Sequence, residues 1–526
     1  MNSTLLTSFK FLCLLSIMFL VGLAPKIQIA RASGTIYIRV DGSVDPPTAP
    51  IEWDGSVYTF RGNASDSIVV EKDDIVIDGA GYSVQGAGIG IGIDLSGRSN
   101  VTVENTRIKG FENGVYLYES SNNTIHGNHI ANSSTAIRLE YSSGNNSVSG
   151  NNMTANTGGI SVGPDSSGNK IYGNSLVRSG CGISLDTVSS NNGIWENSIA
   201  DGVLGISLST SSNYNSMVGN NIANNTLVGI ELLYCSNNSI HGNNITNDDL
   251  GISLEYSSDN NITGNNITNN RGGLNIRFKS SYNIASGNNI VANTKCGITL
   301  DYEAENNSII HNNFLENQQH ARAHPMSHGN FWDNGVEGNL WSNYIGVDLN
   351  HDGVGDTPYL IEANDTDHCP LMGMFHDFTV PLASYPKTEH VEVISNSTVS
   401  SLELGAWLTS PNQYFQPGQP FITIYVDGEN GTQGFCRLMI PRAALNISTY
   451  LVLVDGQPVN ATELPISNNT HAYLYFTYVH SKHEVIVTIP EFPLILIIPI
   501  FMIATLLTAM AHRGKRIRQL VQLYST

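Results

Sequence analysis

A four-residue phrase, made of a small residue, an aliphatic residue, any residue and a second aliphatic residue, recurs ten times between about Gly92 and Asn313. Successive copies lie 22 to 24 residues apart. The phrases begin at Gly92, Gly114, Ala136, Gly159, Gly182, Gly205, Gly229, Gly251, Gly273 and Gly297. Self-similarity at this period is typical of proteins built from stacked repeats.

Many repeats carry a second phrase, Asn-x-Ile-x-Gly-Asn-x-Ile, as at residues 123–130 and 238–245. Alternation with a period of two directs the aliphatic side chains of each short strand to one side. Each repeat therefore offers three short strands separated by Asn, Gly and Ser, which tolerate turn conformations. The apolar runs are too short for a helical solenoid, and leucine-rich spacing is missing. The repeats predict an all-β fold, a parallel β-helix with 22 to 24 residues per coil.

Both ends of the chain predict export and membrane attachment. Lys10, an apolar run at 11–23 and the small-residue site at 30–32 predict a signal peptide over residues 1–32, with an uncleaved anchor as the alternative. A second apolar run predicts a transmembrane helix over residues 491–512, followed by a basic cytoplasmic tail at 513–526. The body of the protein is thus expected outside the cell, anchored by a single pass.

Composition agrees with a surface protein. The 526 residues carry a formal charge of -20, which disfavours binding to nucleic-acid phosphates. Five cysteines remain beyond the signal segment, and their spacing predicts isolated thiols without a disulfide framework. Glycosylation sequons begin at Asn122, Asn132, Asn152, Asn224, Asn244, Asn261, Asn266, Asn364, Asn396, Asn430, Asn446 and Asn460.

The regular repeats divide the rest of the chain. Residues 33–66 are expected to cover the open first coil, 67–316 to form the β-helix and 317–377 to close it. Seven longer alternating runs within 378–490, separated by turns with Gly, Pro and Asn, predict an immunoglobulin-like β-sandwich.

The coils from Ile75–Tyr82 onward resemble those of the NosD-like group of right-handed parallel β-helix proteins, over about residues 68 to 374. A closing passage carries the more specific resemblance. Its segments are Asn330-Phe331-Trp332-Asp333, residues 338–344 (Gly-Asn-Leu-Trp-Ser-Asn-Tyr), residues 348–359 (Asp-Leu-Asn-His-Asp-Gly-Val-Gly-Asp-Thr-Pro-Tyr) and Pro370-Leu371-Met372. This passage is similar to the end of archaeal and bacterial NosD-like surface proteins. The resemblance implies carbohydrate-binding or sugar-cleaving relatives, and its aromatic residues are expected to seal the last coil.

Within the closing passage, Asp348, Asn350, Asp352 and Asp356 surround Gly353. Calcium prefers oxygen ligands from a sharply turned loop, and the Val354 carbonyl is a further candidate ligand. Calcium is therefore the expected cofactor. The pattern departs from an EF-hand because its twelfth position is Tyr359, where an EF-hand has a Glu that binds calcium through both oxygens. A metal-free loop of Asx turns is the alternative.

His320, His324 and His328, with Met326 nearby, would suit copper. Pro325 interrupts any helix that would align them. An exposed polar loop is the favoured interpretation, and copper is not expected.

Catalytic patterns are sparse. Asp248-Asp249 has the composition of a glycosidase carboxylate pair, but a turn suffices to explain it. Arg277 and Lys279 alternate along one expected strand and would neutralise a uronate. Several aromatic residues are either sugar-stacking platforms or ordinary packing residues. They are Tyr116, Tyr118, Tyr141, Trp195, Tyr234 and Tyr256.

These observations favour a membrane-anchored surface protein that binds polysaccharide or glycan, or organises the envelope, without established catalysis. One alternative is a polysaccharide lyase, hydrolase or epimerase acting on the long coil face. A second carries over the NosD role in copper delivery, although no copper-site residues can be mapped. The ligand and the oligomeric state are not determined by the sequence.

Overall fold

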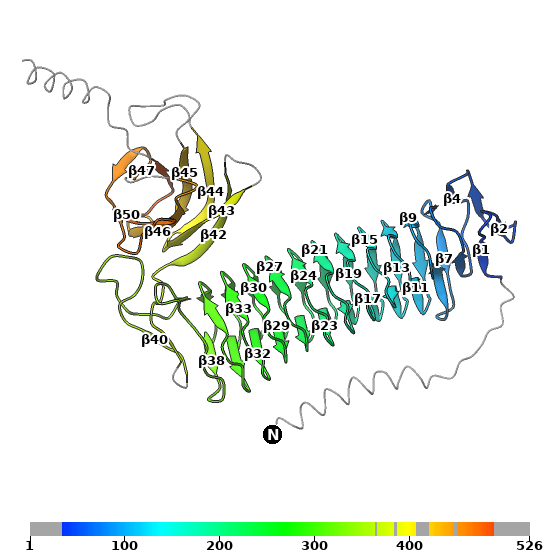
Figure 1. Ribbon diagram of the computed structural model, residues 1–526, viewed down its shortest axis with the longest axis horizontal. Helices are drawn as coiled ribbons and strands as arrows, with labels where there is room; N and C mark the ends of the chain where they lie inside the picture. The colour runs from blue at the N-terminus through cyan, green and yellow to red at the C-terminus, as the bar shows by residue number, and fades with distance from the viewer. Residues whose placement is uncertain (1–33, 363–364, 383–386, 407–419, 446–449, 489–526) are drawn as a thin grey trace, which may run out of the picture.

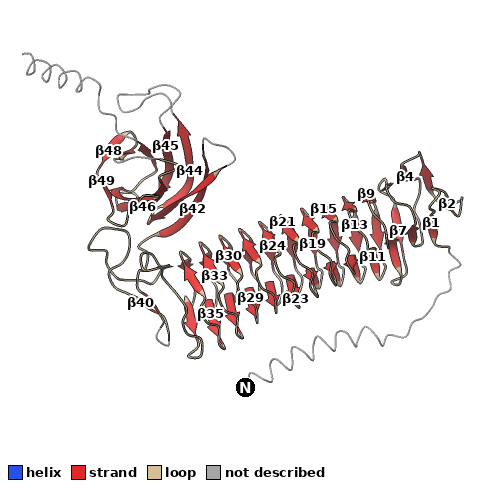
Figure 2. Cartoon of the chain, viewed as in Figure 1, coloured by secondary structure: helices blue, strands red, loops and turns tan. Residues whose placement is uncertain are grey.

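The computed structural model describes residues 34–362, 365–382, 387–406, 420–445 and 450–488. A long ladder of strands dominates the molecule, and a smaller all-β module lies beside the C-terminal end of this ladder (Figure 1). Strands and loops account for all of the described residues, with no helix (Figure 2). The predicted parallel β-helix is confirmed.

Three sheets, here called A, B and C, run the length of the β-helix. In spatial order, sheet A contains β2 (Val44–Asp45), β1 (Ile36–Ile38), β5 (Ile68–Val70), β8 (Ile91–Asp94), β11 (Asn113–Tyr118), β14 (Thr135–Glu140), β17 (Gly158–Val162), β20 (Cys181–Leu185), β23 (Leu204–Ser209), β26 (Val228–Leu233), β29 (Leu250–Glu255), β32 (Gly272–Arg277), β35 (Cys296–Asp301) and β38 (Ala321–Ala323).

Sheet B contains β3 (Ile51–Trp53), β4 (Val57–Phe60), β6 (Val76–Asp78), β9 (Thr102–Glu104), β12 (Thr124–His126), β15 (Ser147–Ser149), β18 (Lys170–Tyr172), β21 (Gly193–Trp195), β24 (Ser216–Val218), β27 (Ser239–His241), β30 (Asn261–Thr263), β33 (Ile284–Ser286) and β36 (Ser308–Ile310). Sheet C contains β7 (Ser83–Gln85), β10 (Arg107–Lys109), β13 (His129–Ala131), β16 (Asn152–Thr154), β19 (Ser175–Val177), β22 (Ser198–Ala200), β25 (Asn221–Ala223), β28 (Asn244–Thr246), β31 (Asn266–Thr268), β34 (Asn289–Val291), β37 (Asn313–Leu315) and β39 (Leu340–Trp341).

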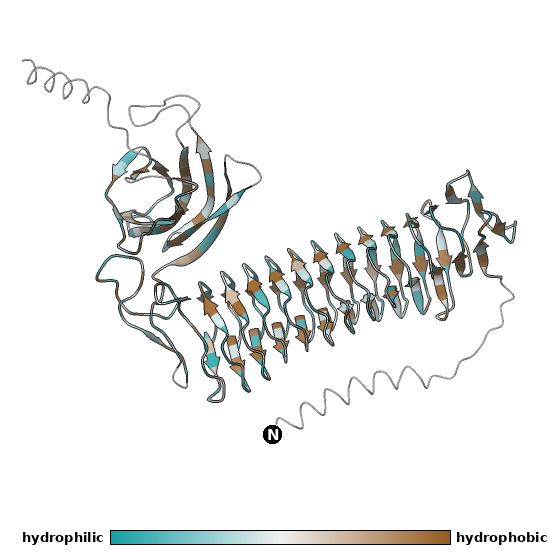
Figure 3. Cartoon of the chain, viewed as in Figure 1, coloured by the Kyte–Doolittle hydropathy of each residue, from teal (hydrophilic) through white to brown (hydrophobic). Residues whose placement is uncertain are grey.

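The recurring phrase lies on sheet A and stacks in register from coil to coil. Ile183 pairs with Ile206, and Ile206 pairs with Ile230, all with fully buried side chains. Inward aliphatic and outward polar residues therefore alternate along each strand (Figure 3). One continuous apolar core runs inside the coils.

The residue at the start of each phrase must be small because the backbone of the next coil packs directly against it. A Cβ atom on Gly205 would lie 2.4 Å from the Gly229 carbonyl oxygen and 2.6 Å from Ile222 Cγ2. Such distances are far inside van der Waals contact, so a larger side chain would force the coils apart.

Buried asparagines form ladders at the corners, a role that sequence analysis did not predict. Asn220 is fully buried; its Oδ1 accepts hydrogen bonds from Asn197 N and Nδ2, both at 3.0 Å. Its Nδ2 donates to the Ile194 carbonyl oxygen at 2.9 Å. The same contacts repeat from coil to coil, as at Asn243. These amides satisfy backbone groups at corners that no strand can pair.

Both ends of the β-helix are covered. At the start, β1 and β2 form one antiparallel pair and β3 and β4 another. At the other end, the buried Trp332 and Trp341 join the core of the last coils, and β40 (Tyr359–Leu360) pairs with β41 (Thr366–Asp367). Trp332 and Trp341 of the closing passage are thus buried as expected, and Tyr344 and Tyr359 pack against them in part, whereas Phe331 is exposed.

The second module, residues 374–488, consists of two five-stranded antiparallel sheets that share an apolar core. One contains β42 (Met374–Pro381), β43 (Thr388–Ser395), β46 (Gln433–Pro441), β50 (His471–Val479) and β49 (Ala461–Glu463). The other contains β44 (Thr398–Ala406), β45 (Pro420–Asp427), β51 (His483–Thr488), β47 (Leu451–Val454) and β48 (Gln457–Val459). Sequence analysis missed β42, β48 and β49.

Two predicted segments lie outside the described residues: the signal peptide at 1–32 and the transmembrane helix at 491–512. Within the described ranges, no helix has the length and apolar character needed to cross a bilayer. The cysteines at 181, 235, 296, 369 and 436 are all free, as predicted. Burial raises the pKa of Cys181 to about 12 and that of Cys235 to about 11, so both thiols stay protonated at neutral pH.

Candidate functional site

The outward face of sheet A is the broadest chemically varied surface of the coils. Its strands reach six residues, whereas the fully coiled strands of sheets B and C have three. One register-aligned row runs Ser184, Ser207, Glu231, Ser253, Asn275 and Thr299. Hydroxyl, amide and carboxylate groups thus lie side by side along the helix axis. This spacing suits an extended ligand that repeats its own polar groups.

A second outward row carries Glu255, Arg277 and Asp301 on three successive strands. Arg277 Nη2 donates to Glu255 Oε1 at 2.5 Å, so its charge is already paired. Lys279 follows the end of β32 in a left-handed turn, 3.4 Å from Glu303. The expectation that Arg277 and Lys279 share one strand face is therefore wrong, because the strand ends between them. Each of the two cations thus has a carboxylate partner on the protein itself.

A column of stacked rings borders this face, one residue beyond each strand. Tyr234, Tyr256, Phe278 and Tyr302 stack with centroid separations of 4.7, 5.5 and 5.2 Å. Interior rings of the column have both faces covered by neighbours. The preceding coil places Ser211 beside Tyr234, where Ser211 N donates to the Tyr234 carbonyl. Thr210 holds the equivalent position one residue beyond β23, so among the described residues no ring stacks on that side of Tyr234, which is 54% exposed.

Other aromatic candidates are used in packing. Trp195 stacks on Tyr172 with centroids 4.7 Å apart, and Tyr118 lies between Tyr116 and Tyr141. Tyr116 donates to Glu140, and burial with this contact raises the pKa of Tyr116 to about 12. These rings therefore pack against one another.

Asp248 and Asp249 do not form a carboxylate pair. Asp248 is buried inside a corner ladder, where its Oδ1 accepts hydrogen bonds from Asn225 N and Nδ2. Its Oδ2 has no partner, and burial raises the pKa of this carboxyl to about 6. Asp249 faces outward and pairs with Arg271. The turn interpretation therefore holds, with the addition that Asp248 takes an asparagine position in the ladder.

The predicted calcium loop holds itself together with its own hydrogen bonds. Asp348 accepts from the backbone N–H groups of Asp352 and Gly353, and Asp352 accepts from that of Val354. Asp356 accepts from Leu349 N. Asn350 is exposed and reaches only Asp352 Oδ2, at 3.3 Å. These contacts fit the Asx-turn alternative, although each carboxylate oxygen keeps a further lone pair for a cation.

The three histidines of the copper alternative lie in separate environments. His320 is buried, with Nε2 3.1 Å from Ser342 Oγ. His324 stacks on Tyr302 and accepts from Met326 N. His328 pairs with Glu305 at 3.0 Å. The described residues bring no three of these nitrogen and sulfur donors together.

A different cluster lies at the junction of the β-helix and the second module, and no motif in the sequence pointed to it. His311 Nε2 is 3.0 Å from Glu337 Oε2, and a carboxylate oxygen of Glu392 lies within 4.8 Å of both donor groups. Arg437 is almost fully buried, with Nη2 2.6 Å from Glu337 Oε1 and Nη1 donating to the Asp352 carbonyl. Burial opposes ionisation of Glu337, but His311 and Arg437 together lower its pKa. Burial raises the pKa of Glu392 to about 7.

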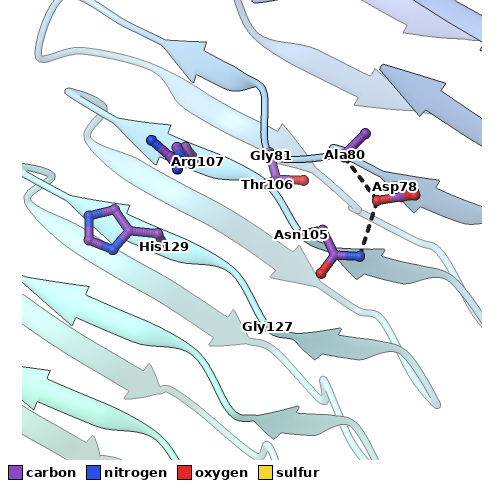
Figure 4. Close-up of a pocket in the computed structure, with 8 residues that line it drawn as sticks. All are labelled: Asp78, Ala80, Gly81, Asn105, Thr106, Arg107, Gly127 and His129. Atoms are coloured by element: carbon purple, nitrogen blue, oxygen red, sulfur yellow. Dashed lines mark hydrogen bonds between the residues drawn. The ribbon is translucent and has the colours of Figure 1, made fainter. Parts of the chain in front are cut away.

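An open hollow of about 390 Å³ lies near the start of the β-helix, at the corner between sheets B and C (Figure 4). Asp78, Asn105, Arg107 and His129 are among its lining residues. Asp78 Oδ1 already accepts from Ala80 N at 2.9 Å and Asn105 Nδ2 at 3.2 Å. The wide, shallow shape and the satisfied carboxylate make it a weaker candidate than the face of sheet A.

Comparison with known proteins gives a family match. A family model described as "Periplasmic copper-binding protein (NosD)" matches residues 63–187 and 178–346, together more than half of the chain. The chain is 40% identical over 78 residues to a "Probable ABC transporter binding protein NosD" of Stutzerimonas stutzeri. It is 38% identical over 77 residues to the protein of the same description from Pseudomonas aeruginosa. Each alignment spans 15% of this chain and 17% of the relative.

Comparison with solved structures found partial likenesses to two alginate-modifying enzymes. The A-module of the Azotobacter vinelandii mannuronan C-5 epimerase AlgE6 is 13% identical, with a TM-score of 0.38, over 52% of this chain and 88% of that chain. The periplasmic alginate epimerase AlgG is 17% identical, with a TM-score of 0.35, over 58% and 84% of the two chains. At these identities the likeness concerns the fold alone.

Proposed function

The chain belongs to the NosD family, and from this premise we propose that it is an exported surface protein whose right-handed β-helix binds carbohydrate. A cleaved signal at 1–32 would direct export, and a helix at 491–512 would anchor the protein with its body outside. The second module, as an immunoglobulin-like sandwich, would act as a spacer between the membrane and the β-helix.

The observation that carries this proposal is the exposed ring of Tyr234, the first ring of the column, beside the polar rows of sheet A. An aromatic ring offers an apolar platform for the C–H face of a sugar, with its hydroxyl at the wet edge. The half-buried hydroxyls of Ser207 and Thr299 suit the sugar's hydroxyl groups, whereas Ser253 and Asn275 of the same row are buried. Strand spacing of about 4.8 Å repeats these contacts along an extended glycan.

Charge on this face favours a neutral glycan. Glu231, Glu255 and Asp301 face outward, and Glu255 already pairs with Arg277. A polyuronate would meet net negative charge along these residues, and the exposed cation Arg322 lies only at the end of the row, beside Thr299. The alternative of a lyase or epimerase acting on acidic polysaccharide would need an unpaired cation among these residues.

Tyr234→Ala is expected to weaken binding of a neutral oligosaccharide roughly tenfold, the loss of about one ring-stacking contact. The full-length protein would first be screened against a glycan array and then titrated with the strongest neutral ligand. Tyr282→Ala removes an equally prominent exposed tyrosine outside the column and serves as the matched control. Equal affinity of both variants and the parent protein would contradict the proposal. Cleavage or epimerisation of alginate or polygalacturonate that Arg277→Ala abolishes would support the enzyme alternative.

We also propose that the loop bearing Asp348, Asn350, Asp352, Val354 and Asp356 binds calcium. Gly353 has φ of +85°, which gives the sharp turn that a calcium loop requires. Millimolar calcium is expected to raise the melting temperature of the full-length protein, because a ligand that binds only the folded state stabilises it. Asp348→Asn should abolish this rise, whereas Asp427→Asn at the exposed end of β45 should keep it. A calcium-independent melting temperature in the parent would leave the Asx-turn loop as the correct interpretation.

The copper-handling alternative is supported by the family description alone. Because His320, His324 and His328 contact different partners, no step through copper is derived from them. Stoichiometric copper that disappears when all three are replaced would revive this alternative.

A further inference from the structure

Ligand atoms from both parts of the molecule converge where the last coils meet the second module. His311 follows β36, Glu337 lies in the closing loop, and Glu392 lies on β43 of the second module. One ring nitrogen of His311 and one oxygen from each glutamate all lie within 4.8 Å of one another. In tetrahedral zinc sites, bonds of about 2.0 to 2.2 Å place ligand atoms roughly 3.4 Å apart. A contraction of at most about 1.4 Å would therefore suffice to coordinate an ion.

The charges around this cluster call for a cation. The side chains of Glu337 and His311 are only 4% and 12% exposed. The guanidinium of Arg437 already has two partners, Glu337 Oε1 and the Asp352 carbonyl. Its Nη1 also lies 3.8 Å from an Asp352 carboxylate oxygen. Glu392 has no hydrogen-bond or ion-pair partner among the described residues. Two carboxylates so close together in a poorly solvated junction repel each other unless a positive charge lies between them.

We propose that His311, Glu337 and Glu392 bind a divalent transition metal of the zinc class and thereby fasten the second module to the β-helix. Imidazole nitrogen and carboxylate oxygen suit zinc, whereas calcium prefers oxygen ligands alone and copper(I) prefers sulfur. Arg437 completes the arrangement, since it would hold one oxygen of Glu337 while the other binds the ion. Such outer contacts orient a ligating carboxylate.

The site requires both parts of the chain. His311 stacks on Phe375, with ring centroids 4.2 Å apart, and Asn313 exchanges hydrogen bonds with the Phe375 backbone at 2.8 and 2.9 Å. These contacts hold β42 and the paired β43 against the last coils, which brings Glu392 to His311. Bound metal would add a link that spans the junction.

The test is titration of the metal-free full-length protein with zinc, followed by calorimetry and by limited proteolysis. One equivalent is expected to bind, to raise the melting temperature and to slow cleavage between the β-helix and the second module. Glu392→Gln and His311→Gln keep the size of the side chain and should each weaken zinc binding at least tenfold. His390→Ala removes an exposed imidazole two residues from Glu392 and should leave binding unchanged.

Failure to bind zinc, or equal binding by Glu392→Gln, His311→Gln and the parent, would overturn the proposal. Weaker binding in His390→Ala than in the two ligand variants would assign the zinc to surface histidines and also overturn it. Asp348→Asn separates this site from the calcium loop, because it should retain zinc binding. Circular dichroism of each variant confirms that it folds before the comparison is made.

Discussion

Asn220→Leu is expected to lower the free energy of unfolding by about 4 kcal/mol, because two buried backbone groups lose the hydrogen bonds that Asn220 makes to them, at about 1 to 3 kcal/mol each. Those groups are Asn197 N, at 3.0 Å from Asn220 Oδ1, and the Ile194 carbonyl, at 2.9 Å from Asn220 Nδ2. Asn197 Nδ2 also loses a contact with Asn220 but keeps its hydrogen bonds to the Ile171 and Trp195 carbonyls. Leucine is similar in volume to asparagine, so a loss of stability would report the missing hydrogen bonds and not a steric clash. Urea denaturation of the purified full-length protein measures the change.

Asn221→Ala is the matched control for this ladder variant. Asn221 is the next residue in the chain, but its side chain is exposed, where its Oδ1 accepts from Asn244 Nδ2. Its replacement is expected to change stability by less than about 0.5 kcal/mol, as usual for surface positions. Equal losses in the two variants would mean that the buried amide ladder does not stabilise the coils.

Asp248→Asn is expected to stabilise the protein by about 3 kcal/mol above pH 7. Burial raises the pKa of the Asp248 carboxyl from 3.8 to about 6. A shift of roughly two units corresponds to about 3 kcal/mol between the two protonation states. The amide introduced by this change also gives the ladder a donor, in the way that Asn270 Nδ2 donates to the Ile245 carbonyl.

The pH dependence of this effect has a definite sign. A carboxyl whose folded pKa is raised favours the folded state most below about pH 4, and this contribution is lost as pH rises through about 6. The advantage of Asp248→Asn should therefore be near zero at pH 4 and grow to its full size by pH 7. Unfolding midpoints at several pH values measure it. Asp249→Asn, at the exposed neighbour paired with Arg271, should show no such rise; a pH-independent advantage at position 248 would contradict the buried-acid interpretation.

Much of the β-helix follows from local sequence. The phrase at Gly205–Leu208 specifies a strand with two inward aliphatics, and its return every 22 to 24 residues specifies coils that stack. The seven predicted strands of the second module also overlap β43, β44, β45, β46, β47, β50 and β51. These features can be predicted from the sequence because each repeat shows the same period-two alternation of apolar and polar residues as its neighbours.

Contacts between distant residues were decided only by the folded chain. The sequence cannot show that Tyr234 begins a ring column, that Arg277 pairs with Glu255, or that Asp248 takes an asparagine place in the ladder. Likewise, no spacing along the chain brings Glu392 to His311 and Glu337. A periodic pattern fixes which side of a strand faces inward, because that depends on neighbours within a few residues. Which side chains meet across coils and between modules depends on register and packing, and these exist only once the whole chain has folded.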